Sequence, residues 1–434
     1  MIKYILLLLL LVACQDSKQH KGDVAIKVIP VEKGITTVVD KLLLSKSVKC
    51  IDLIALETSE VSVFAGIRNI VIAPQYVFIN TMTRVLCFDR NGKYIRDIGQ
   101  LGQGSIDYNY SCGIGVDSVH QIVYVASGLS SNNELKKYSF DGKYLGSLSI
   151  AKRGTQMTSS TDHREDRNYC YVNDKHLFRR LLPVNDGSND IWQIMYQDTL
   201  GKIVDKIYDP ACIEYEKRMV REDKGLSEEQ FRNIWGTHSP MINFFQNNTN
   251  VLFDANDTIY SYSSDEKKLE CRYIMDTHRN PQLDFGDMRV LGKSDAYFKE
   301  IVAREIYEAK DYLYISVEKD DWSYLIEWNK NGGSVCSIRN KGVVKKGVMG
   351  GKIRETLQTG WTNDICGGPQ FYQDHHTRNQ WIGVYYAEDL LNLDVTALKK
   401  EKVLCPNQRD KLVNIIENMT EDSNPVIIVA TLKE

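Results

Sequence analysis

Two short segments near the end of the chain combine side chains that could bind a ligand or take part in catalysis. Their residues are Trp361, Asn363 and Asp364 in the first segment, and Asp374, His375 and His376 in the second. A tryptophan ring offers a flat stacking surface, and amides, carboxylates and imidazoles hydrogen-bond polar groups. The two segments therefore predict a ligand-binding site.

The pair His375 and His376 also belongs to a residue type that binds metals. Adjacent residues of a strand point to opposite faces, so both rings could reach one metal ion only from a loop. A solvent-exposed connection is the simpler interpretation of this segment. No spacing in the sequence indicates a Ser-His-Asp triad, although such triads assemble in space. We therefore expect binding that requires neither a metal nor another cofactor, and we name no catalytic residue.

A glycine-rich stretch at residues 99–104 has the composition of a nucleotide-binding loop. A loop that binds phosphate must open a helix, whose first N–H groups hold the anion. Residues 108–112 read Tyr-Asn-Tyr-Ser-Cys, which is not a helical pattern. The stretch is better interpreted as a connection between two structural repeats.

The N-terminus predicts export and a lipid anchor. Lys3 precedes an apolar run at residues 5–12, which is too short to span a bilayer and is typical of a signal peptide. The ending Leu11-Val12-Ala13-Cys14 resembles a bacterial lipobox. The resemblance implies a signal peptide at residues 1–13, a lipidated Cys14 followed by a tether at residues 14–23, and a lipid bilayer as partner. The alternative is an ordinary signal peptide with a chance cysteine.

Composition narrows the class of protein. The chain has 434 residues and a formal net charge of −3 without a basic stripe, which argues against nucleic acid as a partner. Hydrophobic residues at 43% and charged residues at 26% are ordinary for a globular fold. The 24 tyrosines against 9 prolines favour strands.

The ten cysteines are scattered singly. Because no C-x-x-C pair occurs, neither a zinc ribbon nor a thioredoxin-like dithiol is indicated. Several lie among strand-forming residues, as at 85–88 and 334–338. We interpret them as small buried hydrophobic residues, with one or two disulfides as the alternative.

A turn flanked by strand-forming residues recurs along the chain. Its copies are centred on Asn91-Gly92, Asp141-Gly142, Gly201, residues 262–267 and Asn331-Gly332. Asn-Gly and Asp-Gly predict type I′ turns, with positive φ at both central residues. The spacing of about 50 to 66 residues fits a four-stranded propeller blade with loop insertions.

A sixth, least regular repeat is expected within residues 352–386. Its predicted strands are 353–357, 360–365, 370–372 and 381–386. Helical insertions are predicted at residues 214–235, from a capping box, and near residues 412–419, from apolar spacing. Residues 426–432 predict a strand that closes the ring. The fold class is thus all-β: a six-bladed β-propeller over residues 24–434, with short helical insertions and a C-terminal closing strand.

Several segments carry a resemblance to a known family. Residues 53–58, 88–95, 99–108, 363–368 and 424–427 are similar to the Bacteroides-type six-bladed β-propeller lipoproteins, relatives of NHL-like and TolB-like propellers. This chain has Ser105 and Asp107 where that family usually has Pro and Glu. The resemblance implies a propeller in the cell envelope, lipid-anchored to the outer membrane on its periplasmic face or at the cell surface. It implies no enzyme activity.

Two classes of function remain open. The favoured hypothesis is a membrane-anchored lipoprotein whose propeller binds a glycan, a peptide or an envelope protein without catalysis, through the two segments named first. The alternative is a hydrolase or lyase with an active site on the propeller axis. Whether Asp364, Asp374, His375 and His376 face the central channel discriminates between them.

Overall fold

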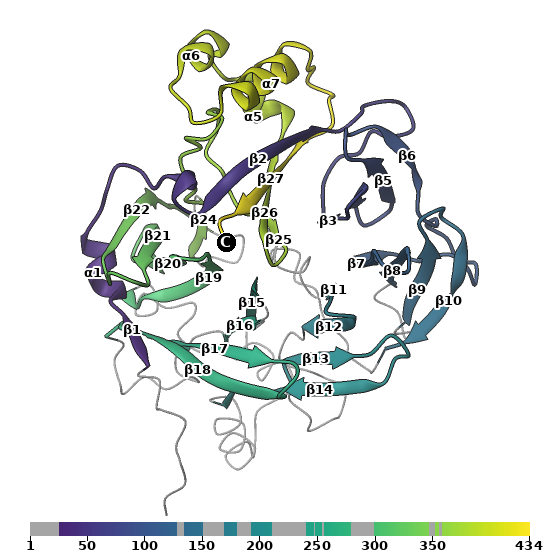
Figure 1. Ribbon diagram of the computed structural model, residues 1–434, viewed down its shortest axis with the longest axis horizontal. Helices are drawn as coiled ribbons and strands as arrows, with labels where there is room; N and C mark the ends of the chain where they lie inside the picture. The colour runs from purple at the N-terminus through teal and green to yellow at the C-terminus, as the bar shows by residue number, and fades with distance from the viewer. Residues whose placement is uncertain are drawn as a thin grey trace, which may run out of the picture.

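The computed structural model describes residues 26–127, 134–150, 169–179, 192–210, 240–246, 248–253, 256–278, 299–346, 352–355 and 358–434. Within these residues the strands form six blades around a central axis (Figure 1), so the predicted six-bladed β-propeller is confirmed.

Each blade is an antiparallel sheet of four strands. From the inside outward, blade 1 consists of β3 (Asn69–Ile72), β4 (Tyr76–Asn80), β5 (Val85–Asp89) and β6 (Tyr94–Asp97), and blade 2 of β7 (Ser111–Asp117), β8 (Ile122–Ser127), β9 (Glu134–Ser139) and β10 (Tyr144–Ser149). In the same order, blade 3 consists of β11 (Tyr169–Val172), β12 (Lys175–Arg179), β13 (Ile194–Gln197) and β14 (Ile203–Ile207), and blade 4 of β15 (Met241–Phe245), β16 (Asn248–Leu252), β17 (Thr258–Ser263) and β18 (Lys268–Met275). Blade 5 consists of β19 (Val302–Glu308), β20 (Tyr312–Lys319), β21 (Trp322–Asn329) and β22 (Val335–Lys341), and blade 6 of β25 (His375–His376), β26 (Gln380–Tyr385), β27 (Val426–Leu432) and β2 (Val48–Ala55).

The hydrophobic core is divided into six clusters, one between each pair of neighbouring blades. In β4, Val77 and Ile79 pack toward blade 6, while the intervening Phe78 packs toward blade 2. Because successive residues of a strand point to opposite faces, one strand supplies both cores. This explains why the middle strands read as continuous apolar runs.

The predicted turns lie where expected, but their geometry differs from the prediction. Only the glycine has positive φ in the first two copies, at 88° for Gly92 and 80° for Gly142. The Gly92 N–H donates to the Asp89 carbonyl, and the Asp89 N–H donates to the Lys93 carbonyl. This is a three-residue loop with a single left-handed glycine, not a type I′ turn. A Cβ on Gly92 would lie 1.9 Å from the Ala55 carbonyl oxygen, so no other residue fits there.

Blade 6 is built from both ends of the described chain. Strand β27 pairs on one side with β26 and on the other with β2, from Val48 opposite Leu432 to Ala55 opposite Val426. The predicted closing strand is therefore confirmed, and its outer neighbour is an N-terminal strand.

Of the four strands predicted for the sixth repeat, one lies in blade 6, one forms in a different sheet and two do not form. Residues 352–355 form β24 (Lys352–Glu355), which pairs with β23 (Val343–Lys346) in a separate two-stranded sheet. Residues 360–365 and 370–372 contribute two isolated bridges only, Trp361 with Phe371 and Thr362 with Leu43. The reason is that β2 and β27 already fill the outer positions of the blade.

The N-terminal segment, residues 26–55, runs along the outside of three blades. Its first strand, β1 (Lys27–Ile29), adds in parallel to β18 of blade 4. Helix α1 (Val31–Thr36) then packs on β21 and β22 of blade 5. After the 3₁₀ turn η1 (Leu44–Lys46), whose Lys46 Nζ lies 2.6 Å from Glu327 Oε1 of blade 5, the segment enters blade 6 as β2.

Three helices connect β26 to β27 and lie outside the ring (Figure 1): α5 (Ala387–Leu391), α6 (Val395–Lys400) and α7 (Pro406–Glu417). Helix α7 confirms the helix predicted near residues 412–419, and its Leu412, Val413 and Ile416 enter the core between blades 5 and 6. The helix predicted at residues 214–235 lies outside the described residues. No helix within the described ranges is long and apolar enough to cross a membrane.

The eight cysteines that lie in the described part of the chain are all free thiols. Burial raises the pKa of the Cys87 and Cys366 thiols to about 12. These two behave as the small buried hydrophobic residues that the sequence predicted.

We predict that ring closure by β27 is required for folding. A chain that ends after Met419 leaves β2 without its only partner strand and exposes the cores on both sides of blade 6. Its melting temperature, followed by circular dichroism, should fall by more than about 10 °C. As a control, a chain that lacks only Lys433 and Glu434 keeps the full β2–β27 register and should melt close to the intact protein. An unchanged melting curve for the first variant contradicts closure by β27.

Candidate ligand-binding site in the central channel

A cavity of about 670 Å³ occupies the central channel. The inner strands β3, β7, β11 and β15 of blades 1 to 4 form most of its wall. Blade 6 contributes residues 375–380 and the end of β27, including Thr431 and Leu432. The end of β27 reaches the channel because β25, the inner strand of blade 6, has only two residues.

The wall of the cavity is largely apolar. Ile70, Ile114 and Val116 line it from blades 1 and 2, and Ile242 and Phe244 line it from blade 4. The polar lining is concentrated on blades 3 and 6. Its members include Tyr169, Tyr171, Arg179, His375, His376, Thr377, Arg378 and Asn379.

The structure places both predicted histidines at this cavity. They lie in β25, with His375 opposite Ile382 and His376 opposite Trp381, and therefore point to opposite sides of the strand. The His376 ring reaches blade 4, where its centroid lies 5.4 Å from that of Phe244. Among the described residues no group of three or more His, Cys, Asp or Glu side chains could hold a metal ion.

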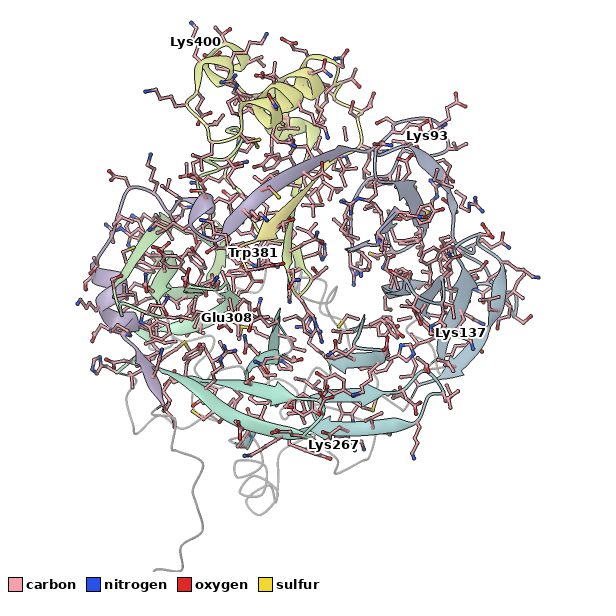
Figure 2. The ribbon with its side chains drawn as sticks, in the orientation of Figure 1. Lys93, Lys137, Lys267, Glu308, Trp381 and Lys400 are labelled. Carbon is pink, nitrogen blue, oxygen red and sulfur yellow. The ribbon has the colours of Figure 1, made fainter. Side chains whose placement is uncertain are left out.

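Trp361 does not lie at the cavity. Its side chain is 1% exposed and packs in an aromatic cluster with Tyr314, at 5.1 Å between ring centroids, and Trp381, at 4.9 Å. Figure 2 shows Trp381 within the ring, on blade 6 where it faces blade 5. In this position Trp361 stabilises the core and presents no stacking surface to solvent.

The other predicted site residues also hold the fold together. Asn363 is buried and donates from Nδ2 to the Tyr385 hydroxyl at 3.3 Å. Asp364 accepts from the Ser45 N–H at 3.0 Å and from its hydroxyl, which fixes the N-terminal segment to blade 6. Asp374 Oδ2 accepts from the Val384 N–H at 3.0 Å. The structure thus separates the predicted site, with only the two histidines on the channel.

Sequence reasoning missed the arginines at the cavity. Arg378 is half-buried in the short loop between β25 and β26. Arg179 ends β12, is 3% exposed, and donates from Nη1 to the Pro240 carbonyl at 2.9 Å. In the sequence, Arg378 is marked only by its position two residues after the paired histidines. That position indicates a cavity residue only when β25 is known to be the inner strand of blade 6.

Behind the blade 3 wall lies a buried histidine that does not line the cavity. His176 Nδ1 is 3.0 Å from the Tyr169 hydroxyl, and its ring centroid is 4.5 Å from that of Tyr124. Burial lowers the pKa of His176 to about 4. The neutral imidazole therefore supports Tyr169, whose ring forms part of the wall.

A buried cluster of charged side chains joins blades 4 and 5. Glu308 is fully buried, with Oε1 2.8 Å from Arg272 Nη2 and 2.9 Å from Lys330 Nζ. Figure 2 shows Glu308 on the inner side of blade 5. Its carboxylate is occupied by these two cations and by the Asn250 amide, which points to a structural role.

These features define a six-bladed β-propeller with a cavity in its central channel. The chain belongs to the family described as a domain of unknown function, DUF4934, which matches residues 26–431. No curated protein matches the chain.

One solved structure supports the same fold. A protein of Bacteroides fragilis NCTC 9343, described as exported, is similar with a TM-score of 0.57 and 13% identity over 94% of this chain and 100% of its own. At that identity the similarity shows the fold alone. PorZ, a surface component of the type-IX secretion system of Porphyromonas gingivalis, has a TM-score of 0.32 and 6% identity over 73% of this chain and 29% of its own. A similarity of that size carries no argument about function.

We predict that His176 makes the protein sensitive to mild acid. Its folded-state pKa of about 4 lies below the ordinary value of 6.5, so the unfolded chain binds the proton more readily between these values. Stability is therefore lost as the pH falls from 6.5 to 4, by roughly 3 kcal/mol in total. Urea unfolding of His176→Gln should show a shallower loss over this range than the unaltered protein.

The control for this measurement is Leu177→Val, because Leu177 is buried on the opposite face of the same strand, β12, and carries no titratable group. This variant should keep the pH dependence of the unaltered protein. Equal loss of stability in the His176→Gln variant and the unaltered protein would show that His176 does not control the response.

Proposed function

We propose that this protein is a lipid-anchored propeller of the bacterial cell envelope that binds a small ligand, without catalysis, in its central channel. The observation that carries the binding role is the cavity in the central channel. Its volume of about 670 Å³ falls in the usual range of small-molecule sites. A monosaccharide or disaccharide, or the end of a glycan or peptide, fits this size better than the face of a folded protein.

The lining of the cavity suits selective binding. Apolar and aromatic side chains from blades 1 to 4 offer a surface for a ring or a hydrocarbon chain, while residues 375–380 supply hydrogen-bonding groups at one side. The wall side chains belong to strands held between two packed cores, so the site is formed before the ligand arrives.

The lipid anchor rests on the lipobox-like residues 11–14, which lie outside the described residues. The exported Bacteroides fragilis protein of similar fold supports an envelope location. Residues 15–25 separate Cys14 from the propeller and, fully extended, reach roughly 40 Å. The tether therefore lets the propeller stand clear of the membrane surface.

We predict that Cys14→Ser releases the protein from membranes in its native host. The residue is the proposed acylation site, and stable anchoring depends on acyl chains that each contribute about 0.8 kcal/mol per buried CH₂. Membrane fractionation with a high-salt wash measures the distribution. The matched control is Cys50→Ser, since Cys50 is an exposed free thiol in β2. Retention of the Cys14→Ser variant on membranes contradicts the anchor.

We predict that ligands bind in the channel and that Thr377→Trp blocks them. Thr377 lines the cavity from the loop between β25 and β26, so an indole there fills space without disturbing a blade core. A glycan and peptide array, probed with protein lacking residues 1–14, identifies ligands, and each hit is tested for turnover. Binding should fall at least about tenfold in Thr377→Trp.

The control variant is Lys400→Trp, at the tip of the helical insertion (Figure 2). It adds the same indole far from the channel and should leave binding unchanged. Ligands that bind equally to both variants lie outside the channel, and turnover of a bound ligand replaces the binding role by an enzymatic one.

A further inference from the structure

The loop between β25 and β26 places a guanidinium at the cavity. Thr377, Arg378 and Asn379 form this loop, closed by a hydrogen bond from the Thr377 N–H to the Gln380 carbonyl. Since β25 has only two residues, the loop begins directly after His376. The Arg378 side chain is half-buried there, at the wall of the channel.

Among the described residues that line the cavity, basic side chains outnumber acidic ones. The charged or titratable lining residues in the described part of the chain, apart from tyrosine and cysteine, are Arg179, Arg378, His375, His376 and Glu434. The only acid of this set, Glu434, lies next to a further cation, because Lys310 Nζ donates to its carbonyl oxygen. On blade 3 the charge of Arg179 opposes the rise in the pKa of Cys170 that burial causes.

The apolar part of the wall strengthens the attraction between these basic groups and a bound anion. Ile242 and Phe244 face the cavity from blade 4, and the Phe244 ring contacts His376. Charges interact more strongly where apolar side chains replace water. A guanidinium also pairs with a carboxylate or phosphate through two parallel hydrogen bonds, which a neutral group cannot reproduce.

We propose that the channel selects organic anions, with the carboxylate or phosphate group held at Arg378 and the apolar or ring portion against the Ile242–Phe244 wall. This inference rests on the proposed function, because it specifies the ligand class of the same cavity. It also assigns Arg378 as the residue that determines specificity.

The test compares probes that differ in charge but hardly in shape. Benzoate is paired with benzamide, glucuronate with glucuronamide, and phenyl phosphate extends the anion series to a phosphate source. Isothermal titration calorimetry at low salt should show at least one anion binding about tenfold more tightly than its neutral partner. Added salt should weaken that binding.

Variants locate the selectivity. Arg378→Gln should remove the preference for the anion, whereas Arg339→Gln, which removes a cation stacked on Trp322 on an outer strand, should not. Should Arg378→Gln fail to fold, Thr377→Glu and its neutral counterpart Thr377→Gln give an independent reading. The added carboxylate should weaken anion binding about tenfold relative to the amide.

The outcomes separate this inference from the proposed function. Binding of the neutral probes as tightly as the anions, abolished by Thr377→Trp, overturns the anion preference and leaves channel binding intact. Anion preference that survives in Arg378→Gln and in Thr377→Glu overturns the role of Arg378. Failure of every probe and of every array ligand to bind overturns both proposals.

Discussion

The whole structure depends on packing between blades. Within the described part of the chain no blade has a core of its own, since each apolar cluster is shared by two neighbours, as Ile382 and Ile427 of blade 6 share one with Val77 and Ile79 of blade 1. Burial of an aliphatic side chain contributes about 1.5–3 kcal/mol, so a blade with one unpartnered face would expose much of its stabilising surface. The ring must therefore close. Strands β2 and β27 meet this requirement by pairing residues from the two ends of the described chain.

The N-terminal segment adds a second constraint outside the ring. It pairs with blade 4 through β1, packs on blade 5 through α1, and completes blade 6 as β2. Polar contacts fix its path, among them Lys46 with Glu327 and Ser45 with Asp364. The segment that leads toward the proposed lipid anchor is thus the one that holds three blades together, so tension on the tether would act on blade 4 first.

Local signals in the sequence were sufficient for the repeats but not for blade 6. The turn at Asn91-Gly92 was recognisable from its dipeptide, and the structure explains the glycine, whose left-handed backbone lies against the Ala55 carbonyl. Blade 6 draws on residues 48–55, 375–385 and 426–432, and no local pattern links segments so far apart. The turns at Gly92 and Gly142 have one residue with positive φ where the sequence predicted two. This difference depends on the length of the loop, which the dipeptide alone does not determine.

The candidate site was predictable to the same limited extent. Trp361 and the paired histidines have residue types that suit both binding and packing, and only the tertiary structure distinguishes the two uses. Trp361 lies in the aromatic cluster between blades 5 and 6, whereas His375 and His376 line the cavity because β25 is the inner strand. Arg378 became a candidate binding residue only when the structure placed its loop at the cavity.

The inner wall of the ring differs between blades 2 and 3 on one side and blade 6 on the other. At blades 2 and 3 the inner wall is tightly packed, since a Cβ on Gly115 would lie 2.6 Å from the Tyr169 hydroxyl and 2.6 Å from the Tyr171 Cβ. At blade 6 the inner strand is reduced to two residues, and a polar loop takes the place of further apolar packing. The rigid side can hold a ring or hydrocarbon in a fixed position, while the loop can change its polar groups at little cost to the cores. Differences in ligand choice within this architecture should therefore arise in the loop between β25 and β26 and not in the walls of blades 2 and 3.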